Sequence, residues 1–188
     1  MTSRPAGDAD EQHLILQARE GSHEAYRLLV NRHMKQAYDV AFRFVGNHEG
    51  AEDITQEAFV RAYHSLSRFR GEAEFSTWLY RIIMNLALNT LKQTKRRARF
   101  EVKDVDLDTV RSVEFNPERS DMILHIERAL HELPTLQRAA VILRHIDGLS
   151  TTQVSDILRC SEGTVKTHLF RGLKKLRTKL AFLRDEAA

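Results

Sequence analysis

Apolar side chains recur at helical spacing along most of the 188-residue chain, and this pattern constrains the fold more than any other feature. Ile54, Ala58, Ala62 and Leu66, for example, follow one another at intervals of four residues and would share one face of a helix. The composition agrees, because only 3 Pro and 8 Gly interrupt a sequence rich in helix-forming residues. We therefore predict an all-α fold.

The pattern divides the chain into two small helical domains joined by a flexible acidic linker. The linker is predicted where six acids stand against two bases, around Asn116-Pro117, although an ordinary solvated loop would also fit this composition. The predicted boundaries are a disordered polar tail at 1–10, a first domain at 11–100, the linker at 101–118 and a second domain at 119–188. A first helical stretch is expected around Leu14, Ile15 and Ala18, and further helices at about 22–44, 51–67, 76–97, 119–132, 134–147, 151–158 and 162–182.

The end of the second domain has the pattern of a helix-turn-helix. Ser150 is a predicted cap for a short helix, and Arg159-Cys160-Ser161 forms a tight turn before a longer basic helix. Residues 161–180 hold six bases and one acid, which suits a helix that neutralises phosphates, although a solvated basic helix would look similar. Its predicted buried face carries Val165, Leu169, Leu173, Leu176 and Leu180, and its exposed face Thr164, Thr167, Arg171, Lys174 and Thr178.

The long helix expected at 76–97 has an apolar face and a face of amides and cations. Trp78 lies at the edge between them, close in sequence to Phe69 and Phe75. Aromatic, amide and cationic side chains in one place suit unstacked bases and their phosphates. Packing into the core is an equally good interpretation for Trp78 and Phe75, whereas Phe69, in a loop, is expected to be freer. The polar stripe carries Arg81, Asn85, Asn89, Lys92 and Arg96.

The helix expected at 51–67 carries a small polar patch on its outer face. Asp53, Gln56 and Glu57 stand at positions i, i+3 and i+4, so they adjoin one another. Such a patch would fit a basic protein surface, but by itself it is also typical of a solvated helix.

Several stretches match the motifs of one protein family in order and spacing. They are 51–63, Phe69-Arg70-Gly71, 75–82 with Asn85, Leu133-Pro134, Gly148-Leu149-Ser150, 163–166 and Phe170-Arg171. Together they resemble the extracytoplasmic-function (ECF) group of bacterial RNA polymerase sigma factors, over about residues 11–182. The resemblance implies a cytoplasmic protein of stress responses that binds core polymerase and promoter DNA and is held inactive by an anti-sigma factor.

The resemblance also implies roles for individual residues. The first domain would be sigma region two, which binds the β′ clamp helices through Asp53, Gln56 and Glu57 and opens the −10 element. The second would be region four, which reads the −35 element as duplex and touches the β flap. The residues implied for −10 are Phe69, Arg70, Phe75, Trp78, Arg81, Asn85, Asn89, Lys92 and Arg96. Those implied for −35 are Thr164, Lys166, Thr167, His168, Phe170, Arg171 and Lys174.

Two other classes of protein fit the sequence less well. A stand-alone helix-turn-helix regulator would share the second domain but would leave the aromatic and cationic features of the first unexplained. An enzyme is not expected, because the nine His are scattered and there is no HExxH, CxxC or glycine-rich phosphate loop. No cofactor or metal is predicted. Cys160, the single cysteine, excludes an internal disulfide, and neither a signal peptide nor a membrane span is expected.

Overall fold

The computed structural model describes residues 6–71, 73–100 and 121–185. Side chains are described for residues 10–71, 73–93 and 121–183. Every regular element within these ranges is a helix, which confirms the predicted all-α class. The predicted acidic linker, 101–118, lies outside the described residues.

Four helices build the first part of the chain, and short polar signals set their ends. The Ser22 side chain accepts a hydrogen bond from the Ala25 N–H and caps the second helix. Gly46 ends that helix with a φ of 80°, a left-handed conformation that glycine adopts without strain. Asn47 then caps the third helix by accepting from the Gly50 N–H at 2.8 Å. The elements are α1 (Ala6–Arg19), α2 (His23–Val45), α3 (His48–Ser65), the short η1 (Leu66–Arg68) and α4 (Phe75–Phe100).

Two boundaries differ from the sequence-based prediction. α3 begins at His48 rather than near residue 51, because the Asn47 side chain caps the helix at this earlier point. The predicted tail at 1–10 is also too long, since α1 already begins at Ala6. Contacts with α2 fix the start of α1: Arg32 donates to the Asp10 carboxylate at 2.5 Å, and His33 Nε2 lies 3.0 Å from a Glu11 oxygen.

The second part of the chain contains the predicted helix-turn-helix. Ser150 and Gln153 form a reciprocal capping box at the start of its first helix. Arg159 adopts the left-handed conformation, with a φ of 53°, in the turn, and Ser161 caps the long helix that follows. The elements are α5 (Asp121–His131), α6 (Thr135–Val141), the π-helical turn η2 (Ile142–Ile146), α7 (Thr151–Leu158), α8 (Glu162–Lys179) and α9 (Phe182–Asp185).

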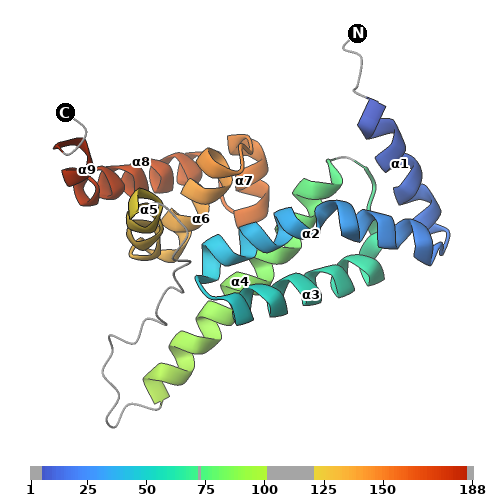
Figure 1. Ribbon diagram of the computed structural model, residues 1–188, viewed down its shortest axis with the longest axis horizontal. Helices are drawn as coiled ribbons and strands as arrows, with labels where there is room; N and C mark the ends of the chain where they lie inside the picture. The colour runs from blue at the N-terminus through green and yellow to red at the C-terminus, as the bar shows by residue number, and fades with distance from the viewer. Residues whose placement is uncertain (1–5, 72, 101–120, 186–188) are drawn as a thin grey trace.

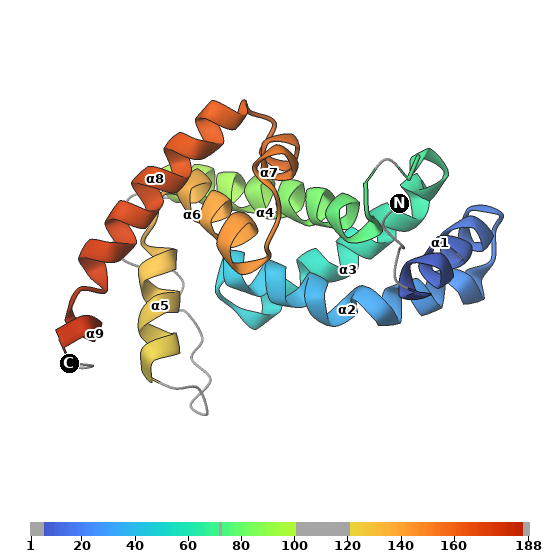
Figure 2. The ribbon, with the colours of Figure 1, turned by 90° about the horizontal axis from the view of Figure 1, so that it is seen from above.

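The two parts pack against each other through a shared set of buried side chains. Leu29, Phe44 and Ile83 are fully or almost fully buried in the first part, and Ile142 and Val154 in the second. These residues belong to one connected apolar cluster. α7 contacts α4, and the two helices lie next to each other in both ribbon views (Figures 1 and 2).

The contact between α6 and α8 depends on a glycine. A Cβ added to Gly172 would lie 2.9 Å from the Val141 Cγ2 atom and 3.4 Å from the Gln137 carbonyl oxygen. Replacing glycine by alanine inside a helix normally stabilises it by up to about 1 kcal/mol. Because Val141 is buried and its β-branched side chain has little freedom at χ1, we expect Gly172→Ala instead to lower the free energy of unfolding by about 1–3 kcal/mol. Urea denaturation measures this. Gly163→Ala, on the same helix but with only the Ser161 Oγ atom nearby at 3.8 Å, is the control and should not destabilise.

Candidate nucleic-acid interface

α8 presents a row of polar and cationic side chains to solvent. Thr164, Thr167 and Arg171 are exposed, as the sequence predicted, and so are Lys166 and Lys174. The opposite side of the helix is anchored by Val165, Gly172 and the partly buried Leu169 and Leu176. The Thr164 hydroxyl lies 2.9 Å from the Ser161 hydroxyl, and the Thr167 hydroxyl donates to the Gly163 carbonyl. Both threonine hydroxyls therefore have partners within the chain, although the two residues are exposed.

One side chain of α8 differs from the helical-wheel prediction. Leu173 is 38% exposed, because the closest approach of α6 occurs at Gly172 and leaves the neighbouring residue outside. His168, which the wheel did not place, is half-buried, and its Nδ1 atom is buried with no hydrogen-bond partner among the described residues. Phe170 is 70% exposed, so a large apolar ring stands among the cations. Such a ring suits the methyl group of thymine in a major groove.

The aromatic residues between α3 and α4 pack together. The Phe69 ring lies 5.1 Å from the Trp78 ring and 6.0 Å from the Phe75 ring, measured between centroids. Phe69 is only 6% exposed, so the expectation that its loop position leaves it free is wrong. The reason is apolar burial: the chain turns inward after η1 and places this ring on the aromatic side chains of α4. Phe75 is buried as well, and Trp78 is partly buried.

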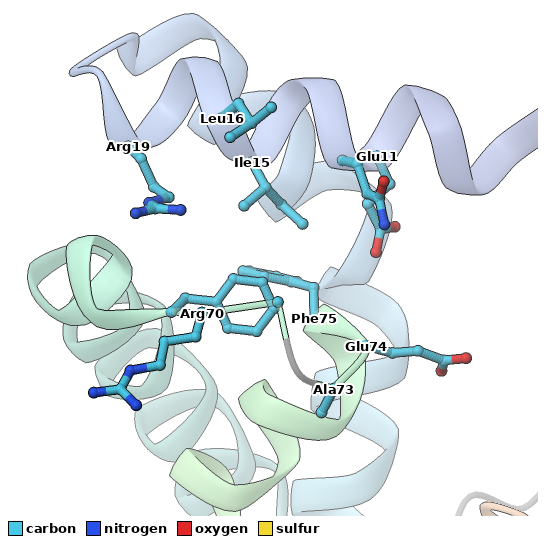
Figure 3. Close-up of a pocket in the computed structure, with 11 residues that line it drawn as sticks. Glu11, Ile15, Leu16, Arg19, Arg70, Ala73, Glu74 and Phe75 are labelled. Carbon is cyan, nitrogen blue, oxygen red and sulfur yellow. The ribbon is translucent and has the colours of Figure 1, made fainter.

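A cavity of about 190 Å³ adjoins this aromatic cluster, between α1 and the segment before α4. Phe69, Phe75, Ile15 and Leu16 supply apolar walls. Figure 3 shows two arginines, Arg19 and Arg70, towards one side of the cavity and two glutamates, Glu11 and Glu74, towards the other. The α1 residues could not be predicted from the sequence, because nothing in their local pattern indicates a contact with a segment more than about 50 residues away along the chain. Flat apolar walls with donors on one side and acceptors on the other suit a planar heterocycle.

The polar stripe of α4 begins beyond this cavity. Asn85 lies ten residues after Phe75, so about 15 Å of helix separates it from the aromatic cluster. Asn89 and Lys92 are exposed on the following turns, and the side chain of Arg96 lies outside the described residues. Asn85 is not among the residues that line the cavity.

The first cation of the stripe is engaged by the second domain. Arg81 lies 3.8 Å from the Asp156 carboxylate of α7, and Gln153 donates to the Thr77 hydroxyl at 3.2 Å. The Arg81 Nε atom is buried with no hydrogen-bond partner among the described residues. In this arrangement Arg81 does not have its full hydrogen-bonding capacity available to DNA.

The patch on α3 is exposed as predicted. Asp53, Gln56 and Glu57 all lie at the surface, and Glu57 accepts a hydrogen bond from Arg61 at 2.7 Å, one turn further along. An exposed ion pair of this kind contributes little to stability. Within the described residues the patch makes no other ion pair or side-chain hydrogen bond, and its acidic side chains lie exposed at the surface.

Comparison with known proteins identifies the family. Residues 29–97 match the family described as Sigma-70 region 2, and residues 123–176 match Sigma-70, region 4. The ECF RNA polymerase sigma-E factor of Haemophilus influenzae is 33% identical over 181 residues, which cover 90% of this chain and 95% of the relative. The chain belongs to the ECF family of RNA polymerase sigma factors. It is thus a subunit for transcription initiation, with RNA polymerase and promoter DNA as its partners.

Solved structures share the fold of this sigma factor. CnrH, in complex with the cytosolic domain of CnrY, is 26% identical with a TM-score of 0.68, and the match covers 92% of this chain and 97% of CnrH. RpoE from Bartonella quintana, in complex with the anti-sigma factor NepR, shares the fold at 21% identity and a TM-score of 0.69, over 83% of this chain and 96% of that one.

Two further classes of site receive no support in the described part of this sigma factor. No group of three His, Cys, Asp or Glu side chains there is placed to hold a metal ion. No helix of that part is long and apolar enough to cross a membrane. The relative from Haemophilus influenzae carries the name of a sigma factor and not of an enzyme.

Proposed function

We propose that this sigma factor divides promoter recognition between its two domains, taken as 11–100 and 119–188 and joined by the acidic segment 101–118. The first domain binds the β′ clamp helices of core polymerase through Asp53, Gln56 and Glu57 and captures the opened −10 element. The second reads the −35 element as duplex and touches the β flap. The observation that carries the proposal is the cavity beside α4. A regulator that binds only duplex DNA would need the helix-turn-helix with α8, but it would not need a pocket that can hold a single base.

Strand capture requires a place for a base outside the stack. The cavity offers Phe69 and Phe75 as walls, an arginine side that suits a phosphate, and a glutamate side that accepts hydrogen bonds from exocyclic amines. From there the strand would follow α4, where Asn85 and Asn89 face base edges and Lys92 neutralises a phosphate. Trp78, Arg81 and Arg96 complete the −10 surface in this proposal.

Duplex recognition falls to the exposed face of α8. Arg171 is central on this face and presents a fork of donors that matches guanine. Thr164, Thr167 and Phe170 offer methyl and ring contacts, while His168 is half-buried and supports the helix more than it reads DNA. Lys166 and Lys174 flank this row and meet phosphates.

Arg171 and Lys174 should behave differently when each is replaced by alanine. Arg171→Ala removes a base contact, so it should cost about 1–3 kcal/mol at one −35 position and relax the preference there. Lys174→Ala removes a phosphate contact, so it should weaken all sequences about equally and reduce the salt dependence by about one ion. Binding of holoenzyme to a library of −35 variants at several salt concentrations measures both. An unchanged preference for Arg171→Ala would mean that α8 lies differently in the groove.

The regulation that we propose is binding by an anti-sigma factor. The CnrH structure contains the cytosolic domain of a second protein, and the RpoE structure contains an anti-sigma factor. We place the chain in the cytoplasm, where core polymerase acts, and assign it no catalytic residue of its own.

Run-off transcription with bacterial core polymerase and a promoter library tests the proposal as a whole. Transcripts that depend on the chain, from templates sharing two sequence elements about 25 base pairs apart, would support it. Binding of the chain to duplex promoters without polymerase, and no dependent transcripts, would instead favour a stand-alone helix-turn-helix regulator.

A further inference from the structure

Glu11 is held more firmly than the other acid that lines the cavity between α1 and the segment before α4. Its Oε2 atom lies 3.0 Å from the His33 Nε2 atom and 3.6 Å from an Arg32 nitrogen. Burial lowers the pKa of His33, although the charge of Glu11 opposes the fall, so the neutral ring donates its Nε2 hydrogen to the carboxylate. Glu74, the other acid, is exposed, and the Ser76 hydroxyl lies 3.4 Å from it. The position of the Glu11 carboxylate is therefore fixed from behind, by α2.

His33 also supports the aromatic wall of the cavity. Its side chain is buried, and its ring centroid lies 5.0 Å from that of Phe75, which lines the cavity. One buried ring thus contacts both a wall and the anchored acceptor. Recognition of a small ligand improves when the groups that touch it are locked in this way by a second set of contacts.

Arg19 stands at the opposite side of the cavity from Glu11, as Figure 3 shows. Eight residues separate the two along α1, which is about 12 Å of helix and leaves room for one nucleotide between their charges. A second hollow, of about 270 Å³, shares Leu16 and Arg19 with the cavity and is completed by Glu20 and Ser67. A sugar and its phosphate can therefore lie beside the Arg19 guanidinium while the base enters the cavity.

A nucleotide held in this direction turns one particular group towards Glu11. The substituent on C4 of a pyrimidine or C6 of a purine lies on the side of the base far from the sugar. In cytosine and adenine this substituent is an amino group, which donates hydrogen bonds, and in thymine and guanine it is a carbonyl oxygen, which accepts them. A carboxylate only accepts, so it binds the first pair of bases and repels the second.

We propose that Glu11 is a specificity-determining residue of the −10 cavity, which admits cytosine or adenine and rejects thymine and guanine, with His33 as its positioning residue. The inference rests on the proposed capture of a −10 base in this cavity. It adds the identity of that base and gives α1 a part in reading it. The residues matched to Sigma-70 region 2 begin at residue 29, so α1 lies outside them. A site built to bond a donor discriminates well, because its own polar group stays unpaired when the donor is missing.

Base analogues that exchange the amino group for a carbonyl test this selectivity. Holoenzyme is titrated, by fluorescence anisotropy, with a single-stranded −10 oligonucleotide from a promoter that it transcribes. Each cytosine is replaced in turn by uracil and each adenine by hypoxanthine. At one position the wild type should lose about tenfold or more in affinity. Glu11→Gln should lose most of that preference, because an amide also donates to a carbonyl oxygen. His33→Phe, which keeps a ring against Phe75 but has no N–H, should weaken the preference in the same direction.

The neighbouring acid on α1 provides the matched control. Asp10 pairs with the same Arg32, at 2.5 Å, but does not line the cavity. Asp10→Asn removes the same charge from the same helix and should keep the wild-type preference for the amino base. The preference is a ratio of two affinities of one protein, so a variant that folds less completely lowers both affinities and leaves the ratio unchanged. Loss of α1 packing is thereby distinguished from loss of recognition.

The outcomes separate this inference from the proposed function. Wild-type preference in Glu11→Gln overturns the assignment of Glu11, and wild-type holoenzyme that binds every analogue as well as the parent strand overturns the selectivity. In both cases base capture stands if Phe69→Leu weakens binding of the strand. Holoenzyme that does not bind the strand, or that binds it equally well with Phe69→Leu, overturns base capture in this cavity, and the selectivity with it.

Discussion

Reversing two charges on α3 should remove this sigma factor from core polymerase. Asp53→Lys with Glu57→Lys places two cations where the proposed partner surface is basic, and like charges brought together at an interface cost several kcal/mol. We expect the affinity for core polymerase to fall at least about 100-fold, measured by fluorescence anisotropy or co-purification. The fold should persist, because both side chains are exposed and the only ion pair lost among the described residues is the surface pair with Arg61.

The matched control carries the same change in net charge on a different surface. Glu20→Lys with Glu24→Lys alters the turn between α1 and α2, where Glu24 forms an exposed pair with Arg27. This variant should bind core polymerase about as well as the wild type. Equal losses in the two variants would show that net charge matters and the α3 patch does not; no loss in either would place the polymerase contact elsewhere.

Local signals in the sequence were enough to predict most of the helices. Ser150 and Ser161 were expected near helix starts, and the structure shows both as caps. A helix was expected to end near residue 147, and Gly148 adopts a positive φ after η2. These signals act within a few residues along the chain, so they are visible without knowledge of the fold.

Contacts between distant segments could not be predicted in this way. Arg43 and Asp147 are 104 residues apart, and neither carries a local pattern that indicates the other. Leu173 was placed on the buried face because a helical wheel assumes an even partner surface, whereas α6 approaches α8 most closely at Gly172. A helical wheel therefore shows the direction in which a side chain points, but it does not show how closely the neighbouring helix approaches at that residue.

In the proposed −10 site, too, local features could be predicted from the sequence and distant contacts could not. The sequence drew attention to the aromatic residues and to the polar stripe of α4, and the family resemblance suggested their use. It did not show that Phe69 faces inward, or that α1 completes a cavity with Glu11 and Arg19. Because Phe69 is buried, removing its whole ring would leave a cavity that by itself lowers the free energy of unfolding by about 3–5 kcal/mol. A variant that tests the site should therefore keep an apolar side chain at this position.

Strand opening should fail when the cavity loses its flat wall. Phe69→Leu keeps an apolar side chain in the core but removes the ring on which a base would lie. Because holding a base outside the stack costs a few kcal/mol, we expect open-complex formation by holoenzyme to fall about 10- to 100-fold. Asn85→Ala, about 15 Å further along α4, should also reduce it by removing contacts to the following bases. Permanganate reactivity of the −10 thymines measures opening, and recruitment to the −35 element should persist in both variants.

A second buried phenylalanine separates this effect from a loss of packing. Phe59 is as buried as Phe69 but does not line the cavity, so Phe59→Leu should open promoters normally if its stability is sufficient. A promoter already unpaired by mismatches at −10 should recover part of the Phe69→Leu defect, because the cost of unpairing no longer falls on the protein. The same template should leave Phe59→Leu unchanged. If Phe69→Leu opens a duplex promoter as well as the wild type does, the aromatic cluster is only structural, and the captured base must lie at another site.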